Sequence, residues 1–475
     1  VHLLSILSLP AIALLVYYKK YKEHTFTGAL IAMAAGVGAI VFIMKGIIVG
    51  IPTLWQKMEL LLVNTFGLPV HSGIIPTLLI IAAIGYFALN YAQKKGSQVL
   101  QIAAISAILI TVAFSTIGVV VIRANTDTPI NMNVPGDAMR LLPYLNREQY
   151  GERPLLYGPH YDAEPSDVKR TPRYGRVGDK YEIVDEKYDY VYDKKDKILF
   201  PRIGHTDQGR PDLHRMWREA LNGDSKGKPS MGYNIQFLLN YQINWMYIRY
   251  FMWNFVGRQT AEQGYYPWDI SKGNWMSGVT PIDEAKLYKM DKLPDSIKND
   301  ESANKYYFLP LIFGLLGMVF HFVQRRKDFT TLFVLFIITG LGIIIYSNQP
   351  PNEPRERDYV LVGSFMTFCI WIGFGVLAIY QFLASKIQGV TPALIAGVLV
   401  LSAPVIMGFQ NFDDHSRKYH YASRDYAANF LNSLAPNAII FTYGDNDTYP
   451  LWYAQEVENI RRDVRVVNLS LIAVD

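Results

Sequence analysis

Two carboxylates and an amide lie close together in the segment Gly444–Thr448, between an expected strand end and an expected helix start. Open α/β sheets bind ligands at this position. Asp445, Asn446 and Asp447 therefore offer oxygens to sugar hydroxyls, to an acceptor or to a divalent cation, and the Asp-x-Asp spacing matches a metal-binding pair of many nucleotide-sugar transferases. A glycine turn with an N-cap at Asp447 or Thr448 explains the same residues equally well. We assign no metal site.

Two arginines, Arg355 and Arg357, lie in the proline-rich segment Asn348–Asp358, between two hydrophobic runs. At headgroup depth their guanidinium groups suit a lipid phosphate or pyrophosphate, which such groups bind in a bidentate manner. They are the candidates for binding a donor phosphate. The alternative is an interfacial loop in which the arginines pair with neighbouring carboxylates (Glu353, Glu356 and Asp358), since exposed ion pairs are common.

Other catalytic signatures are weak. His205 and His214 match no metal-ligand spacing, and a solvated loop is the simpler interpretation. The sequence contains no P-loop, nucleophile elbow or HExxH motif. A catalytic residue therefore stays unknown.

The elements that position these residues are mostly hydrophobic runs of roughly 17–25 residues, long enough to cross a bilayer. They predict a polytopic α-helical membrane protein with about eight spans: Leu3–Tyr18, Phe26–Gly50, Gly73–Ala92, Val99–Ile122, Tyr307–Val323, Phe329–Tyr346, Tyr359–Leu383 and Val390–Met407.

Basic residues mark alternate connections between these spans. Lys19, Lys94, Arg325 and Lys386, with neighbouring lysines and arginines, follow the first, third, fifth and seventh runs. By the positive-inside rule these loops are cytoplasmic. The segment Asn348–Asp358 (the arginine loop), the long polar insert 124–306 and the C-terminal tail then lie on the opposite side of the membrane. This arrangement predicts a bacterial inner-membrane protein with large periplasmic regions.

Four segments follow from this pattern: helices in 1–123, an extracytoplasmic α+β insert in 124–306, helices in 307–409, and the start of an α/β domain in 410–475. The insert is expected to contain a helix Asp137–Tyr150 capped by Asp137, a strand pair in Lys180–Asp193 and a helix Pro211–Asn222. The aromatic segment Asn234–Val256 is too polar for a ninth span and predicts an interfacial helix with tyrosines and tryptophans at headgroup depth.

The C-terminal tail predicts helix, strand, helix and strand in turn: Tyr419–Ser433, Ala438–Tyr443, Tyr449–Asn459 and Val464–Leu471. This order is typical of a parallel α/β unit. The chain begins within an apolar run and stops directly after a strand, so we expect a piece of a longer protein.

Charge and cysteine content exclude some functions. The formal net charge is +5, without a basic tract, so nucleic acid is not an expected partner. Cys369 is the only cysteine, which excludes an intrachain disulfide.

Three blocks carry a family resemblance: Phe441–Leu471, Gln349–Phe365 and Tyr241–Gln259. They resemble a bacterial multi-span membrane family of formerly unknown function, which is similar to the vertebrate transmembrane O-mannosyltransferases of the GT-C class. The resemblance implies transfer of a mannose-like sugar from a polyprenyl-phosphate donor to a protein or glycan acceptor on the outer face. It also implies an acidic catalytic base after the first membrane helix, and we expect that residue upstream of Val1.

Two other classes stay open. A multi-span transporter would be expected to carry ionisable residues at mid-membrane, and the runs here are almost free of charge. A non-catalytic envelope scaffold would use its external regions to bind a partner. Membrane lipid is the partner common to all three classes.

Overall fold

The structure, a computed structural model, describes residues 3–126, 128–148, 153–207 and 209–472. The chain is mostly helical, and small two-stranded sheets make up its β structure. It divides into two compact units that interleave along the sequence. The first unit comprises Val1–Ile40, Arg153–Val168 and Tyr190–Ser416, and the second comprises Val41–Glu152, Lys169–Asp189 and Arg417–Asp475.

Six helices among the described residues are long and apolar enough to cross a membrane. They are Phe26–Thr65, Ile74–Lys94, Gln98–Ala124, Arg326–Ser347, Asp358–Ala384 and Thr391–Asn411. They correspond to six of the eight expected spans. The other two runs form shorter helices, α1 (Leu9–Lys20, after a 3-10 segment Leu3–Ser8) and α13 (Leu309–Gln324), and their crossing of a membrane stays a prediction.

The first of the six helices is longer than the sequence suggested. It joins α2 (Phe26–Val41), a π-helical segment Phe42–Ile48, α3 (Gly50–Glu59) and a second π-helical segment Leu60–Thr65. The expected end at Gly50 is wrong. Pro52 does not stop the helix because it lies in the first turn of α3, where proline needs no N–H partner.

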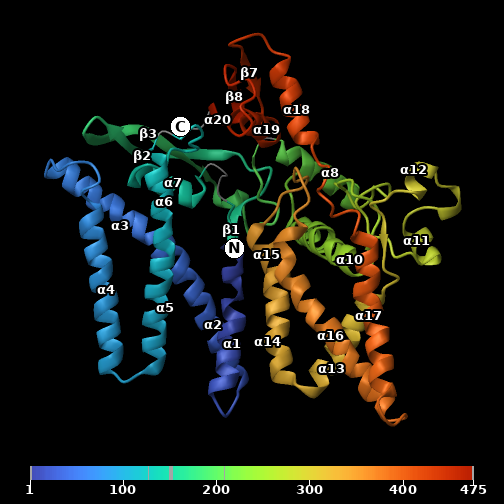
Figure 1. The fold of residues 1–475 in the computed structure, drawn as a ribbon. Helices are drawn as coiled ribbons and strands as arrows, with labels where there is room; N and C mark the ends of the chain where they lie inside the picture. The colour runs from blue at the N-terminus through green and yellow to red at the C-terminus, as the bar shows by residue number, and fades with distance from the viewer. Residues whose placement is uncertain (1–2, 127, 149–152, 208, 473–475) are drawn as a thin grey trace. The chain divides into compact units, whose positions relative to one another are not determined.

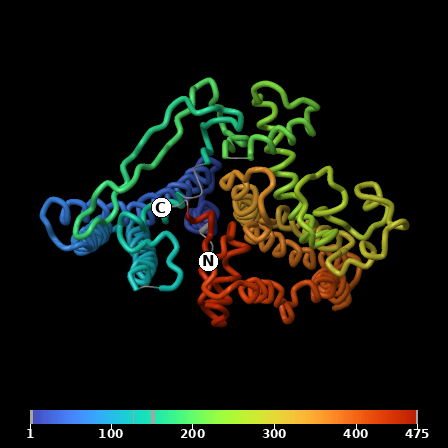
Figure 2. Tube along the Cα trace, turned by 90° about the horizontal axis from the view of Figure 1, so that it is seen from above, coloured from blue at the N-terminus to red at the C-terminus, as the bar shows by residue number. Residues whose placement is uncertain are grey.

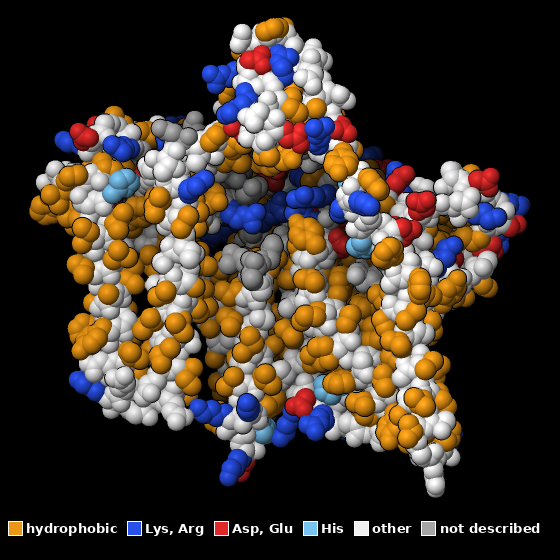
Figure 3. All heavy atoms as spheres, viewed as in Figure 1, with side chains coloured by type: hydrophobic (Ala, Val, Ile, Leu, Met, Phe, Trp, Pro, Cys, Tyr) orange, Lys and Arg blue, Asp and Glu red, His pale blue; other side chains and the backbone are white. Residues whose placement is uncertain are grey.

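Hydrophobic side chains cover the flanks of the long helices (Figure 3). In α4 (Ile74–Lys94) and α5 (Gln98–Phe114), for example, Phe87 is 66% exposed and Leu109 is 62% exposed. Apolar side chains directed outward over helices of this length are expected where lipid replaces water. The chain is a multi-pass membrane protein.

In the first unit, α13 and α16 (Val362–Ala384) form the closest helix pair. A side chain at Gly317 would meet the Trp371 carbonyl oxygen, and one at Gly375 would meet the Phe313 carbonyl oxygen. Glycine at both positions lets the two backbones approach closely, as is common between membrane helices. The pair packs with α14 (Arg326–Ile337) and α17 (Thr391–Asn411) (Figure 1). A π-helical segment, Ile338–Gly342, joins α14 to α15 (Ile343–Ser347).

The ends of these helices follow the expected alternation. Lys327 Nζ lies 2.8 Å from His24 Nδ1, and Gln324 donates to Gln381 over 3.2 Å, so three of the basic connections meet at one end of the unit. At the other end Asn411 donates to the Tyr306 hydroxyl over 2.6 Å. The insert and the arginine loop join that second end. Which end faces the cytoplasm stays a prediction.

The aromatic segment forms one helix from Met231 to Phe255, composed of α9 (Met231–Phe237), a π-helical segment Leu238–Ile248 and α10 (Arg249–Phe255). It is not one of the six candidate spans, and Phe251 of α10 contacts Phe336 of α14 and Phe368 of α16. Its large rings are buried in protein (Tyr241, Trp245, Tyr247, Tyr250 and Trp253). These rings therefore pack within the protein, and the position of the helix at headgroup depth stays a prediction.

The rest of the first unit is irregular and carries short elements. Strand β1 (Tyr157–Pro159) pairs with β4 (Lys197–Leu199), and β5 (Gly257–Arg258) pairs with β6 (Asn304–Lys305), both antiparallel. The expected helix Pro211–Asn222 is confirmed as α8 (Arg210–Asn222). The short helices α11 (Thr280–Lys286) and α12 (Asp295–Lys298) follow.

In the second unit, α4 and α5 are followed by α6 (Gly118–Ala124) and α7 (Ala138–Asn146). The predicted cap of α7 is confirmed, because Asp137 accepts from the backbone N–H groups of Met139 and Arg140 at 2.8 and 3.1 Å. The helix ends at Asn146, and the expected end, Tyr150, lies outside the described residues.

The expected strand pair within Lys180–Asp193 is wrong. This stretch forms one long strand, β3 (Lys180–Tyr192), which pairs with β2 (Pro165–Val177), and the two run side by side (Figure 2). The hairpin turn falls at Gly178, whose φ of 62° suits glycine. The charged residues that suggested an inner turn are half-buried within the strand, where Asp185 and Glu186 pair with Arg173 and Arg170 of β2.

Buried Glu59 joins the parts of the second unit. Its carboxylate accepts from Trp55 Nε1 at 3.3 Å, the Gly73 N–H at 2.8 Å, the Tyr181 hydroxyl at 3.3 Å and the His71 N–H. It connects the end of α3 with the start of α4 and with β3.

The C-terminal part of the second unit is a βαβ unit, as the sequence predicted. Helix α18 (Ala422–Asn432) precedes β7 (Ile439–Thr442), α19 (Asp445–Glu456), β8 (Arg465–Asn468) and the short α20 (Leu469–Ile472). The strands are parallel, with Ile439 opposite Arg465. The helices pack on the sheet through a small apolar core that includes Leu431, Leu451 and Ala454.

Candidate functional site

The arginine loop follows α15 and is held firmly by the insert. Asn348 and Asn352 have positive φ values, 41° and 56°, which let the proline-rich chain turn twice. Tyr241 donates to the Pro350 carbonyl oxygen over 2.7 Å, and Gln242 donates to the Asn348 side chain over 3.0 Å. Both donors lie on the buried helix Met231–Phe255, so that helix fixes the loop.

Glu356 is the centre of this arrangement. Its carboxylate receives two hydrogen bonds from the Arg249 guanidinium group, at 3.1 and 2.7 Å, and one from the Gly264 N–H at 3.1 Å. The Tyr250 hydroxyl donates to it as well. The Arg249 side chain is 3% exposed, and its guanidinium carbon lies 4.0–4.6 Å from the ring centroids of three aromatic side chains (Trp245, Tyr250 and Trp253).

The two candidate arginines differ in their surroundings. Arg357 pairs with Glu353 over 2.8 Å, and Glu353 is 7% exposed. Burial lowers the pKa of Arg357, but the opposing effects, of which Glu353 is the largest, raise it overall. The alternative that the arginines pair within the loop is thus confirmed for Arg357, whereas Glu356 pairs outside the loop.

Arg355 is exposed and makes no hydrogen bond or ion pair with any residue that the structure describes. It borders a narrow crevice of about 10 Å³, which does not enclose a ligand, together with aromatic residues of the buried helix (Tyr241, Trp245 and Tyr250). Glu353 and Glu356, the carboxylates nearest in sequence, are already bound to other cations. Arg355 is therefore the guanidinium group of this loop that is available to a ligand.

His205 and His214 are not solvated, contrary to expectation. Both are buried, and their rings stack with His205 Nδ1 2.9 Å from His214 Nε2. His205 Nε2 lies 2.8 Å from the Asn348 carbonyl oxygen, which can only accept. We therefore assign the protons to Nε2 of both rings. Through the hydrogen bond to Asn348, the buried histidine pair fixes the start of the arginine loop.

This histidine pair predicts a pH-dependent stability. Burial lowers the pKa of His205 to about 3 and that of His214 well below its usual value. In the unfolded chain both rings take up protons near pH 6.5, so the stabilisation is complete above that pH and is lost as the pH falls toward 3. Between pH 7.5 and 5 we expect a loss of about 2 kcal/mol per histidine in the free energy of unfolding.

The measurement is denaturant unfolding at several pH values for the wild-type protein and for His205→Gln/His214→Phe. The double variant should be less stable at neutral pH but less sensitive to acid. An equal loss between pH 7.5 and 5 in both proteins would exclude the histidine pair as the cause.

Arg202 is a third residue whose position the sequence did not indicate. Its fully buried guanidinium group donates to the carbonyl oxygens of Ile345 and Leu155 at 2.8 and 3.1 Å, and lies 4.0 Å from the Phe200 ring centroid. Burial lowers its pKa to about 10. It makes no ion pair with a described residue, and it joins the insert to the end of α15.

The acidic segment lies at the carboxyl end of β7, as predicted. Asp445, Asn446 and Asp447 are exposed in the first turn of α19, and Gly444 is the N-cap with a φ of 81°. The alternative N-cap at Asp447 or Thr448 is therefore wrong. Thr448 is buried inside the helix and donates to the Gly444 carbonyl oxygen over 2.8 Å.

A metal site is not formed by this segment alone. Among the described residues no group of three or more His, Cys, Asp or Glu side chains is placed to hold a metal ion. The three side chains are free to contact a ligand from solvent, and their role in binding a sugar or acceptor stays a prediction.

The long apolar helices and the buried polar insert define the class, a multi-pass membrane protein. Within that class, residues 423–475 match the model of TMEM260-associated domain 2, and residues 151–239 match a family of unknown function, DUF8416. No curated protein and no solved structure matches the chain. The chain is thus similar to a TMEM260-associated domain over its βαβ unit.

Proposed function

We propose that this chain belongs to a membrane glycosyltransferase of GT-C type, which transfers a mannose-like sugar from a polyprenyl-phosphate donor to a protein or glycan acceptor. The observation that carries the proposal is the match of residues 423–475 to a TMEM260-associated domain, because TMEM260 is an O-mannosyltransferase-related membrane protein family. The candidate spans agree with a lipid-borne donor.

Arg355 is the residue that we assign to the donor phosphate. It is a guanidinium group without a bound carboxylate, and it borders a narrow crevice lined by aromatic and amide side chains and by two carboxylates that already pair with other arginines. A phosphate would receive charge-assisted hydrogen bonds from it. Arg357 acts as a positioning residue, since its pairing with Glu353 holds the loop that carries Arg355.

The acceptor side of the reaction is assigned to the βαβ unit. The exposed Asp445, Asn446 and Asp447 offer oxygens and an amide to sugar hydroxyls. Both regions would face the periplasm of a bacterial inner membrane if the basic loops face the cytoplasm.

The test compares envelope proteins and glycans from cells that contain or lack the protein. Intact-mass analysis should reveal hexose additions that depend on the protein and disappear with Arg355→Ala. Unchanged glycosylation in its absence would contradict the proposal. Sugar-lipid flux into vesicles that contain the protein but lack any acceptor would instead indicate a transporter.

A further inference from the structure

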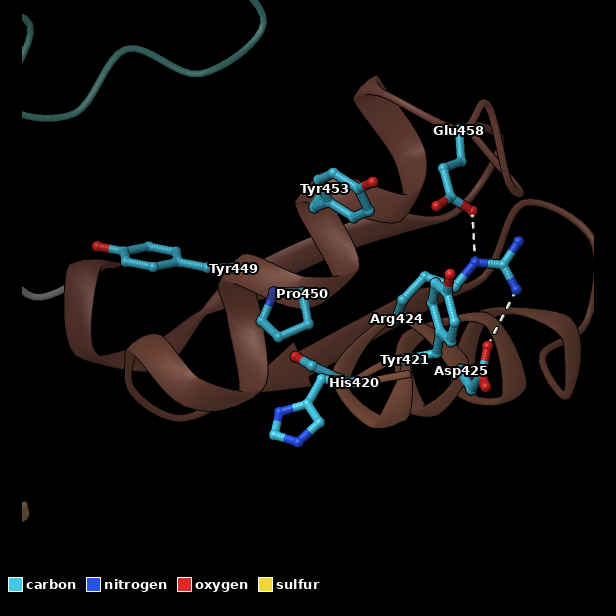
Figure 4. A pocket seen from close by; sticks show the side chains of 9 residues that line it. His420, Tyr421, Arg424, Asp425, Tyr449, Pro450, Tyr453 and Glu458 are labelled. Carbon is cyan, nitrogen blue, oxygen red and sulfur yellow. Dashed lines mark hydrogen bonds and ion pairs between the residues drawn. The ribbon is translucent and has the colours of Figure 1, made fainter. Parts of the chain in front are cut away.

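A groove lies between the start of α18 and one side of α19 in the second unit (Figure 4). Tyr421 and Tyr453 supply aromatic rings to it, and Pro450 lies near them, whereas the Tyr449 ring extends away from Arg424 and Glu458 and stacks on Trp452. Polar side chains complete the lining (His420, Ser423, Arg424, Asp425 and Glu458). The groove is separate from Asp445 and Asp447, which do not line it.

The polar side of the groove is held in place by a chain of ion pairs. Arg424 Nε donates to Glu458 over 2.8 Å, and Arg424 Nη1 donates to Asp425 over 3.0 Å, as Figure 4 shows. Glu458 follows α19, while the other two residues belong to α18. These ion pairs thus link both walls of the groove. The apolar core around Leu431 and Leu451 holds the two helices together beneath it.

The aromatic side is open to solvent. Tyr421 and Tyr453 are 58% and 47% exposed. Single exposed aromatic residues need no explanation, but two that line one groove beside fixed polar groups are typical of a binding site.

We propose that this groove binds a carbohydrate. One face of a sugar ring presents C–H groups, whose partial positive charge suits the negative face of a tyrosine ring. The hydroxyl groups at the ring edge both donate and accept hydrogen bonds, so they match a carboxylate and a guanidinium group placed side by side.

Other ligand classes fit the same residues less well. A free phosphate would meet Arg424 already paired with two carboxylates, and Asp425 and Glu458 would repel it. A lipid chain or an apolar peptide would bury the ion-pair chain without offering it hydrogen bonds, which is costly. A neutral oligosaccharide satisfies both sides of the groove.

This inference concerns binding and does not depend on the transferase reaction. It can therefore fail while the proposed function holds, and it can hold if the chain transfers no sugar.

The experiment is isothermal titration of the whole protein with neutral oligosaccharides, beginning with mannose trimers. The detergent must carry no sugar headgroup, because such a headgroup would compete for the groove. Tyr453→Ala and Tyr421→Ala are each expected to weaken binding about tenfold, which corresponds to the loss of one aromatic contact. Tyr453→Phe, which keeps the ring, should bind almost as the wild-type protein does.

The matched control is Tyr443→Ala, since Tyr443 is 75% exposed in the same βαβ unit but does not line the groove. This variant should bind normally. Absence of binding to any neutral oligosaccharide would overturn the proposal, as would equal weakening by Tyr443→Ala. Binding of an unglycosylated peptide in place of sugar, with the same dependence on Tyr453, would assign the groove to peptides and also overturn it.

Discussion

Replacing Glu356 with alanine is expected to lower the free energy of unfolding by about 3–5 kcal/mol, the cost of leaving a buried charge without its partner. Arg249 lies 3% exposed between aromatic rings, and Glu356 is its partner in an ion pair with two hydrogen bonds. The Tyr250 hydroxyl and the Gly264 N–H lose the same acceptor. Denaturant unfolding in detergent measures the change.

A double-mutant cycle separates the contribution of the Arg249–Glu356 pair to the free energy of unfolding from the effects of the surrounding residues. Arg249→Met/Glu356→Ala should be more stable than Glu356→Ala alone, because it removes the unpaired charge. The matched control is Glu301→Ala, an exposed carboxylate of the same unit. Glu301 makes no hydrogen bond or ion pair with a described residue, so a change below about 1 kcal/mol is expected. A loss of less than 1 kcal/mol for Glu356→Ala would show that the pair does not hold the loop.

Arg355→Ala is expected to leave stability unchanged and to raise the KM for the sugar donor about tenfold to hundredfold. The side chain is exposed and has no partner among the described residues, so the fold does not depend on it. A hydrogen bond to a charged group contributes about 1.5–3 kcal/mol, which sets the size of the effect on binding. Initial rates at several donor concentrations measure KM.

Two further substitutions show whether the change in KM is specific to the Arg355 guanidinium group. Arg355→Lys should recover part of the affinity, because lysine supplies the charge without the planar fork. Arg326→Ala removes an equally exposed arginine from a basic connection at the other end of the first unit and should not alter KM. An unchanged KM in Arg355→Ala would exclude this residue from donor binding.

Most long elements could be predicted because their signals are local. Run length and loop charge indicated six helices that the structure also has, and Asp137 indicated the start of α7. The βαβ order followed from short apolar runs separated by Gly444. The predicted helix end at Gly50 was wrong, because no local signal in the sequence showed that the helix would continue to Thr65.

The site could be predicted only in part because its contacts join distant parts of the chain. Glu356 pairs with Arg249, 107 residues away, and His205 contacts Asn348, 143 residues away. No spacing rule encodes such pairs. One signal was present: an arginine within an otherwise aromatic helix requires a carboxylate partner if the helix is buried, and the loop at Asn348–Asp358 offered three.

The most direct measurement is transfer of labelled mannose from polyprenyl-phosphate mannose to an envelope acceptor by the purified full-length protein in proteoliposomes. We predict donor-dependent product formation that falls at least tenfold with Arg355→Ala at limiting donor and is unaffected by Arg326→Ala. Absence of product from a folded preparation, or equal rates in the wild-type protein and Arg355→Ala, would contradict the assignment of this chain as a glycosyltransferase with Arg355 at the donor phosphate.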